Sequence, residues 1–171
     1  MIRTIENSFL KISVSDHGAE LTSIHDKINN REVLWQADPA YWKRHAPVLF
    51  PNVGRNYKDT WRLSGKEYPS KQHGFARDSE FICTDITDSS LTFVLKSSEE
   101  TLKVYPFAFG LKITYTLKDH DLDVCWEIVN KDSEIMYFTI GAHPAFCVPA
   151  REGEVQSDYR LTFEKQDSLT Y

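Results

Sequence analysis

Apolar and polar residues alternate over much of this sequence, and this two-residue period restricts the possible folds more than any other feature does. The alternation is clearest in four segments, residues 10–14, 91–95, 111–117 and 122–128. Successive side chains of a β-strand point to opposite faces, so these segments are typical of strands that bury one face. Short turn sequences rich in Asp, Ser and Asn separate the later segments. We therefore expect an all-β fold, an antiparallel sandwich or barrel.

Four further segments predict the remaining elements. The continuous apolar run at 135–140 predicts a strand covered on both sides, and residues 159–164 predict a strand at the sheet edge. Residues 38–44 begin with Asp-Pro, which is typical of a helix N-cap followed by proline and predicts one or two helical turns. Residues 97–105 place two serines before two glutamates, which predicts another capped turn that ends before a proline.

The charge balance and the hydropathy exclude several classes of protein. Lys and Arg total 20 and Asp and Glu total 25, and the net charge of −5 argues against a nucleic-acid partner. No segment approaches the roughly 20 consecutive apolar residues of a membrane-spanning helix, and the first residues have no apolar signal core. The cytoplasm is therefore the expected location. Because the chain has no linker, repeat or biased tract, we expect residues 1–171 to form a single domain.

Several common kinds of site have no motif here. The cysteines Cys83, Cys125 and Cys147 are odd in number and widely spaced, which predicts free thiols in a reducing compartment. No clustered set of histidines and carboxylates indicates a metal site. The nucleophile motif G-x-S-x-G and the phosphate loop G-x-x-x-x-G-K are both missing from the sequence. We therefore expect neither a metal nor another cofactor.

Three segments that interrupt the alternation combine glycine, proline and polar side chains, at residues 46–55, 72–77 and 141–146. Two of them contain a histidine, His73 and His143, and histidine is the side chain best suited to exchange protons near pH 7. A histidine in a turn is also commonly a structural hydrogen-bonding residue, so both interpretations stay open on spacing alone.

Two arginines flank the glycine-containing turns. Arg55 follows Gly54, and Arg77 lies three residues after Gly74. A guanidinium group with several donors binds sugar hydroxyls or a phosphate. A packing or surface role explains each arginine equally well from the sequence.

Seven segments in order resemble the aldose 1-epimerase (galactose mutarotase-like) family, and specifically its bacterial galactose mutarotase-related branch. They are residues 18–21, 34–35, 47–55, 65–68, 73–77, 105–107 and 141–146. The resemblance implies the galactose mutarotase-like supersandwich, an antiparallel β-sandwich that binds a hexose. It also implies an isomerase that interconverts the α and β anomers of a hexose or hexose 6-phosphate by acid–base ring opening.

The resemblance also implies roles for the four site residues. The histidine at the position of His143 protonates the ring oxygen, and the one at His73 hydrogen-bonds the sugar. The arginine at Arg55 orients the substrate, and Arg77 is a candidate phosphate ligand.

Family members are longer, and their catalytic base is a glutamate in the C-terminal portion. We therefore expect this chain to be the N-terminal portion of the sandwich, with apolar inner-face positions exposed and the base missing. The alternative is a non-catalytic carbohydrate-binding protein on the same fold.

Overall fold

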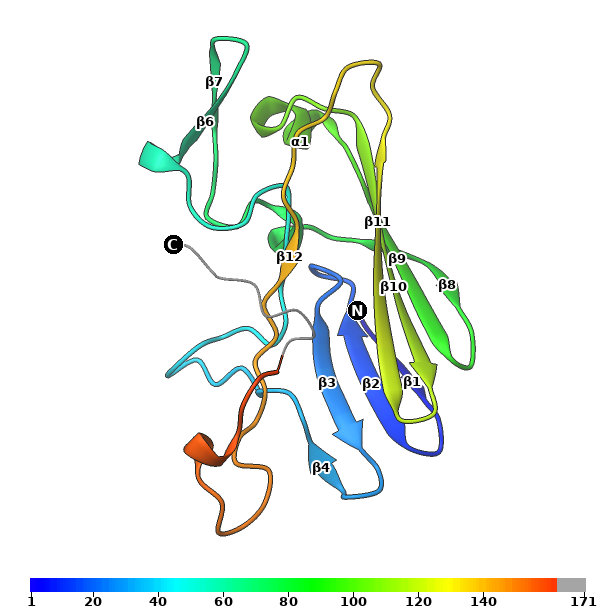
Figure 1. Ribbon diagram of the computed structural model, residues 1–171. Helices are drawn as coiled ribbons and strands as arrows, with labels where there is room; N and C mark the ends of the chain where they lie inside the picture. The colour runs from blue at the N-terminus through cyan, green and yellow to red at the C-terminus, as the bar shows by residue number, and fades with distance from the viewer. Residues whose placement is uncertain (163–171) are drawn as a thin grey trace.

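The computed structural model describes residues 1–162 and contains two four-stranded antiparallel sheets (Figure 1). The first sheet follows chain order, with β1 (Ile2–Glu6), β2 (Leu10–Ser15), β3 (Leu21–Asp26) and β4 (Arg31–Glu32). The second has the order β11-β10-β9-β8 and is formed by β8 (Ile82–Ile86), β9 (Ser90–Lys96), β10 (Phe109–Lys118) and β11 (Asp121–Asn130). Each strand therefore pairs with its neighbours in sequence.

Two further strand pairs and several short helices lie outside these two sheets. β5 (Val48–Leu49) pairs with β12 (Gly141–Ala142), whereas β6 (Thr60–Leu63) and β7 (Lys66–Pro69) form a hairpin that projects from the sandwich (Figure 1). The helices are η1 (Tyr57–Asp59), η2 (Ala76–Asp78), α1 (Glu99–Val104) and η3 (Gln156–Asp158). Over residues 1–162, none of them has the length and apolar character that crossing a bilayer requires.

The two four-stranded sheets pack against one apolar core. Inward-facing residues from both sheets belong to it, and Ile12 of β2, Phe93 of β9 and Ile113 of β10 are each 0% exposed. The hydroxyl of Tyr115 on β10 donates a 2.7 Å hydrogen bond to the carbonyl of Ala19, which links the second sheet to the end of the first. The fold is an antiparallel β-sandwich, and the alternating segments are its strands, as predicted.

The apolar face of the second sheet continues onto β11, where less of it is covered. In the register of β10 and β11, Leu111 lies opposite Ile128 and Tyr115 lies opposite Val124. The two β10 residues are buried, whereas Val124 is 41% exposed. Within residues 1–162, β11 pairs only with β10, which leaves its other edge free. The described sandwich therefore leaves part of its inward face open, as expected.

The prediction of a strand covered on both sides at 135–140 is wrong. This segment has no strand in the structure, and Ile135 is 71% exposed. It crosses from the second sheet to β12 without a neighbouring ladder, and Thr139 donates one backbone bond to Pro51. Only part of it packs, since the ring of Phe138 lies 5.8 Å from that of Phe50. An apolar run reports a tendency to be buried but not the presence of a covering layer.

The two predicted helical turns have different outcomes. Ser98 caps α1 through reciprocal bonds with Thr101, which confirms that prediction. Residues 38–44 form a turn and no helix, although the Asp38 side chain accepts a bond from the Ala40 amide as a cap would. The predicted edge strand at 159–164 is also wrong over 159–162, and residues 163 and 164 lie outside the described residues.

Candidate active site

The segment at residues 46–55 brings the three unusual segments together. The carbonyl of Phe50 accepts backbone bonds from Phe75 at 3.0 Å and Ala76 at 3.1 Å. The amide of His143 donates to the carbonyl of Pro47 at 3.1 Å, next to the β5–β12 pair. Both histidine-bearing segments are therefore hydrogen-bonded to the same central stretch of backbone, from its two sides.

Glycine is required where the 72–77 segment meets this stretch. Gly74 has φ +71° and forms a parallel bridge with Phe50. A Cβ atom at this position would lie 2.2 Å from the Phe50 carbonyl oxygen. Its neighbour His73 also has a positive φ of 65°, an uncommon conformation for a residue with a side chain. This local backbone geometry fixes the direction in which the His73 side chain leaves the chain.

The two imidazoles lie next to each other. The ring centroids of His73 and His143 are 6.2 Å apart, with the rings edge to face at 64°. The Nδ1 atom of His73 accepts a 3.0 Å bond from the amide of Gly54, so in the neutral ring the proton is on Nε2. His73 is therefore a fixed donor, whereas His143 is exposed and lies against the ring of Trp42, with centroids 5.1 Å apart.

Burial is the main cause that lowers the pKa of His73 below its ordinary value, followed by the positive charges of Arg77 and His143. Unfolded chains then take up this proton at a higher pH than folded ones, so stability decreases as pH falls below about 6.5. We expect the free energy of unfolding to decrease between about pH 7 and 5, and His73→Gln to make that decrease smaller. Urea unfolding over this range measures both slopes, and identical slopes would contradict the assignment.

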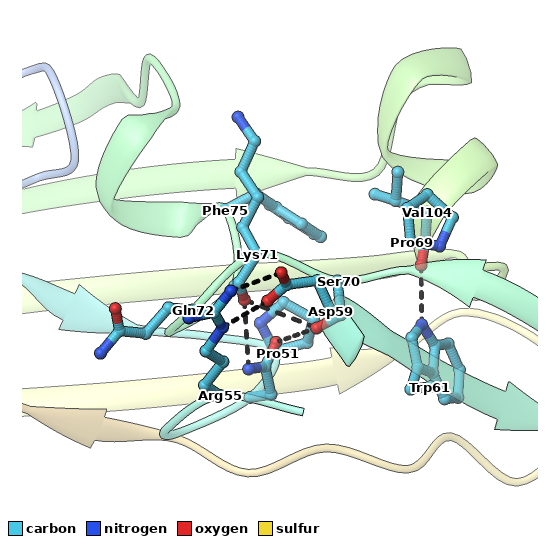
Figure 2. A pocket seen from close by; sticks show the side chains of 12 residues that line it. Pro51, Arg55, Asp59, Trp61, Pro69, Ser70, Lys71, Gln72, Phe75 and Val104 are labelled. Carbon is cyan, nitrogen blue, oxygen red and sulfur yellow. Dashed lines mark hydrogen bonds and ion pairs between the residues drawn. The ribbon is translucent and has the colours of Figure 1, made fainter. Parts of the chain in front are cut away.

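A cleft of about 710 Å³ lies next to His73. Gln72 and Gly74, the residues on either side of this histidine, both line it. Its lining also includes Arg55, which forms two 2.6 Å bonds to the carboxylate of Asp59 (Figure 2). These bonds lower the pKa of Asp59, which keeps it ionised. Of the four predicted site residues, Arg55 is the one that lines this cleft.

Arg77 lies behind the loop that carries His73. Its Nη2 atom donates a 2.8 Å bond to the carbonyl of Gln72, and the residue does not line the cleft. The Nε atom is buried and has no hydrogen-bond partner among residues 1–162. Burial lowers the pKa of this guanidinium group. The contacts give Arg77 a supporting position, and its predicted contact with substrate stays a prediction.

Four further residues shape the site. Glu20 is 7% exposed, and its carboxylate accepts bonds from the amides of His45 at 2.6 Å and Ala46 at 3.1 Å, which fixes the start of the central segment. The others are Asp59 beside Arg55, Trp42 beside His143, and Trp61 in the cleft wall, whose indole donates to Val104 at 2.9 Å.

Sequence reasoning assigned no role to Asp59 or Trp61. Glu20 appeared only within the motif at residues 18–21, and Trp42 was not a candidate site residue. The one available signal was the position of Asp59 four residues after Arg55.

Two further features of the described residues concern cysteines and metal ligands. All three cysteines are free thiols, as predicted. Over residues 1–162, no group of three or more His, Cys, Asp or Glu side chains is placed to hold a metal ion.

The fold and the site together define a class of protein, an antiparallel β-sandwich that holds two adjacent imidazoles beside a cleft with polar and apolar walls. The sequence model of the family described as aldose 1-epimerase matches residues 1–171. The chain belongs to the aldose 1-epimerase family.

Individual relatives agree with this assignment. Protein LacX (plasmid) of Lactococcus lactis subsp. lactis is 38% identical over 172 residues, which cover 97% of this chain and 57% of LacX. The galactose mutarotase related enzyme of Lactobacillus acidophilus has a TM-score of 0.89 and 46% identity, over 92% of this chain and 53% of that one. A galactose mutarotase-like protein of Lactobacillus casei ATCC 334 has a TM-score of 0.83 and 46% identity, over 85% of this chain and 50% of that one. The chain spans about half the length of these relatives.

Proposed function

We propose that this chain forms the sugar-binding and acid-bearing portion of an aldose 1-epimerase site. The observation that carries the proposal is the pair of adjacent imidazoles, one fixed as a donor and one exposed, beside a cleft with polar and apolar walls. Its substrate is an aldohexose, whose anomers interconvert when the bond between C1 and the ring oxygen opens and closes again on the other face.

In the proposed reaction the acid is His143, which gives its proton to the ring oxygen as the ring opens. His73 donates its Nε2 hydrogen to the same region of the sugar, and its lowered pKa keeps it a neutral donor. Arg55 orients the sugar through its guanidinium donors. A base removes the proton of the C1 hydroxyl, and on closure the proton transfers reverse. The proposal assigns this base to no residue of the chain, because the family's glutamate belongs to the C-terminal portion.

Exchange NMR on anomeric mixtures of galactose and glucose tests the proposal. We expect the chain to broaden the resonances of one of these sugars, which reports binding. We expect its acceleration of α/β exchange to be small, because without the base the reaction loses a contribution of about 10²–10⁴-fold. Unchanged line widths for both sugars would contradict the proposal. A large acceleration of α/β exchange in a buffer without carboxylates would show that the base lies within this chain. That result would overturn the proposal that no residue of this chain supplies it.

A further inference from the structure

The charged groups of the cleft influence whether it binds a neutral or a phosphorylated sugar. The charged residues that line it are Arg55, Asp59 and Lys71. Arg55 uses Nε and Nη2 to bind the two carboxylate oxygens of Asp59, both at 2.6 Å. The Lys71 side chain is directed away from this pair (Figure 2). One edge of the guanidinium group that could bind an anion is therefore already occupied by a carboxylate of the same chain.

The backbone around Asp59 holds this carboxylate in place. Lys58 and Asp59 both have φ of 53°, two successive residues with side chains in the left-handed region. The amide of Asp59 donates to Asn56 at 3.0 Å, and its carbonyl accepts from Ser70 at 2.8 Å. Backbone in this region is unfavourable for residues other than glycine, so tertiary contacts maintain it. The arrangement connects the hairpin formed by β6 and β7 to the cleft floor and directs Asp59 at Arg55.

A bidentate pair of this kind treats a hydroxyl and a phosphate differently. A sugar hydroxyl both donates and accepts, so it donates to Asp59 and accepts from the free Nη1 of Arg55 without separating the two. Asp59 occupies Nε and Nη2 on one edge of the guanidinium, which leaves a phosphate group only the remaining donors, and the phosphate carries negative charge close to the carboxylate. Because the exposed pair itself is weak, the repulsion by Asp59 contributes more to this discrimination than the strength of the pair does.

We infer that Asp59 makes this cleft select an uncharged hexose over its 6-phosphate, by placing a carboxylate charge in the cleft and by occupying one edge of the Arg55 guanidinium. The binding of the sugar in this inference rests on the proposed function. The exclusion of anions by Asp59 does not depend on it. Asp59 is in this sense a specificity-determining residue that touches the substrate through its carboxylate.

The test compares the wild-type chain with Asp59→Asn, using glucose, glucose 6-phosphate and inorganic phosphate as separate probes in NMR titrations at low salt. In the wild type we expect glucose to bind more tightly than glucose 6-phosphate. In Asp59→Asn we expect the affinity for glucose 6-phosphate relative to glucose to rise roughly tenfold, the effect of one nearby unit charge in partly hydrated surroundings. The affinity for inorganic phosphate should rise to a similar degree, and added salt should reduce both gains.

Two further variants show whether the gain depends on the cleft. Glu67→Gln removes the same charge from the same hairpin, where Glu67 pairs with Arg62 outside this cleft, and should leave phosphate affinity within about twofold of wild type. The double variant that combines Asp59→Asn with Arg55→Met should lose the gain in affinity for phosphate. Tighter binding of glucose 6-phosphate than of glucose by the wild type, or equal gains in Asp59→Asn and Glu67→Gln, would overturn the inference. If no sugar binds, the proposed function fails, and the inorganic phosphate titration still decides the exclusion of anions by Asp59.

Discussion

Replacing Gly74 by alanine is expected to destabilise the fold by about 4 kcal/mol, a large fraction of the roughly 5–15 kcal/mol by which domains are stable. The added Cβ would lie 2.2 Å from the Phe50 oxygen and 2.6 Å from the Pro51 nitrogen, so two backbone segments would have to separate. The φ of +71° adds a conformational cost of about 1–2 kcal/mol for any residue with a Cβ. The measurement is urea unfolding, and we expect the midpoint to shift strongly downward.

Gly65→Ala is the matched control for this prediction. Gly65 has φ +79°, but a Cβ there would meet no atom within 4 Å, so only the conformational cost of about 1–2 kcal/mol applies. The difference in the free energy of unfolding between the two variants measures the contribution of the close backbone approach at Gly74, next to His73. Equal losses of stability in the two variants would show that this approach is not required.

Replacing His143 by glutamine is expected to remove the catalysed anomer exchange when a small carboxylate supplies a base. Acetate should raise the exchange rate with the wild-type chain above the sum of the separate effects of acetate and of the chain. Without the imidazole proton donor we expect a decrease of about 10²–10⁴-fold in this acetate-dependent exchange. Exchange NMR on the sugar that shows line broadening measures it. Glutamine keeps a hydrogen-bonding group of similar reach, so the sugar should still bind.

His120→Gln is the control, because His120 lies in the β10–β11 turn against Phe9, away from the paired imidazoles. We expect its acetate-dependent exchange to equal that of the wild type. An undiminished exchange in His143→Gln would exclude His143 as the acid. Line broadening without any acetate-dependent exchange in the wild type would favour the alternative, a protein that binds carbohydrate without converting it.

Strands and their faces were predictable because the responsible interactions are local. The alternation in residues 111–117 reflects side chains that point to opposite faces of β10, and the structure buries the predicted face. The capped helix after Ser98 depends on side chains only three residues apart. The two histidines stood out as candidate site residues because rigid turns of glycine and proline interrupt the alternation around them.

Other features depended on packing that the local sequence does not contain. The apolar run at 135–140 has no covering layer on both sides, and the Asp38 turn does not continue as a helix. Arg55 and Arg77 are alike in the sequence, yet one lines the cleft and the other supports the loop at Gln72. Nothing local distinguishes them, because the difference lies in which distant backbone segment each side chain meets.

The sequence by itself determined the all-β class, the antiparallel strands, the family and the two candidate histidines. These follow from periods, turns and motifs within short stretches of chain. Only the tertiary structure decided that the rings of His73 and His143 lie 6.2 Å apart and that Asp59 occupies the guanidinium of Arg55. The first contact joins residues far apart in the chain, and the second depends on a backbone conformation that tertiary contacts maintain. The first is set by how the 46–55 segment binds its neighbours, and the second by the bond between Asp59 and Ser70, and both are properties of the packed chain.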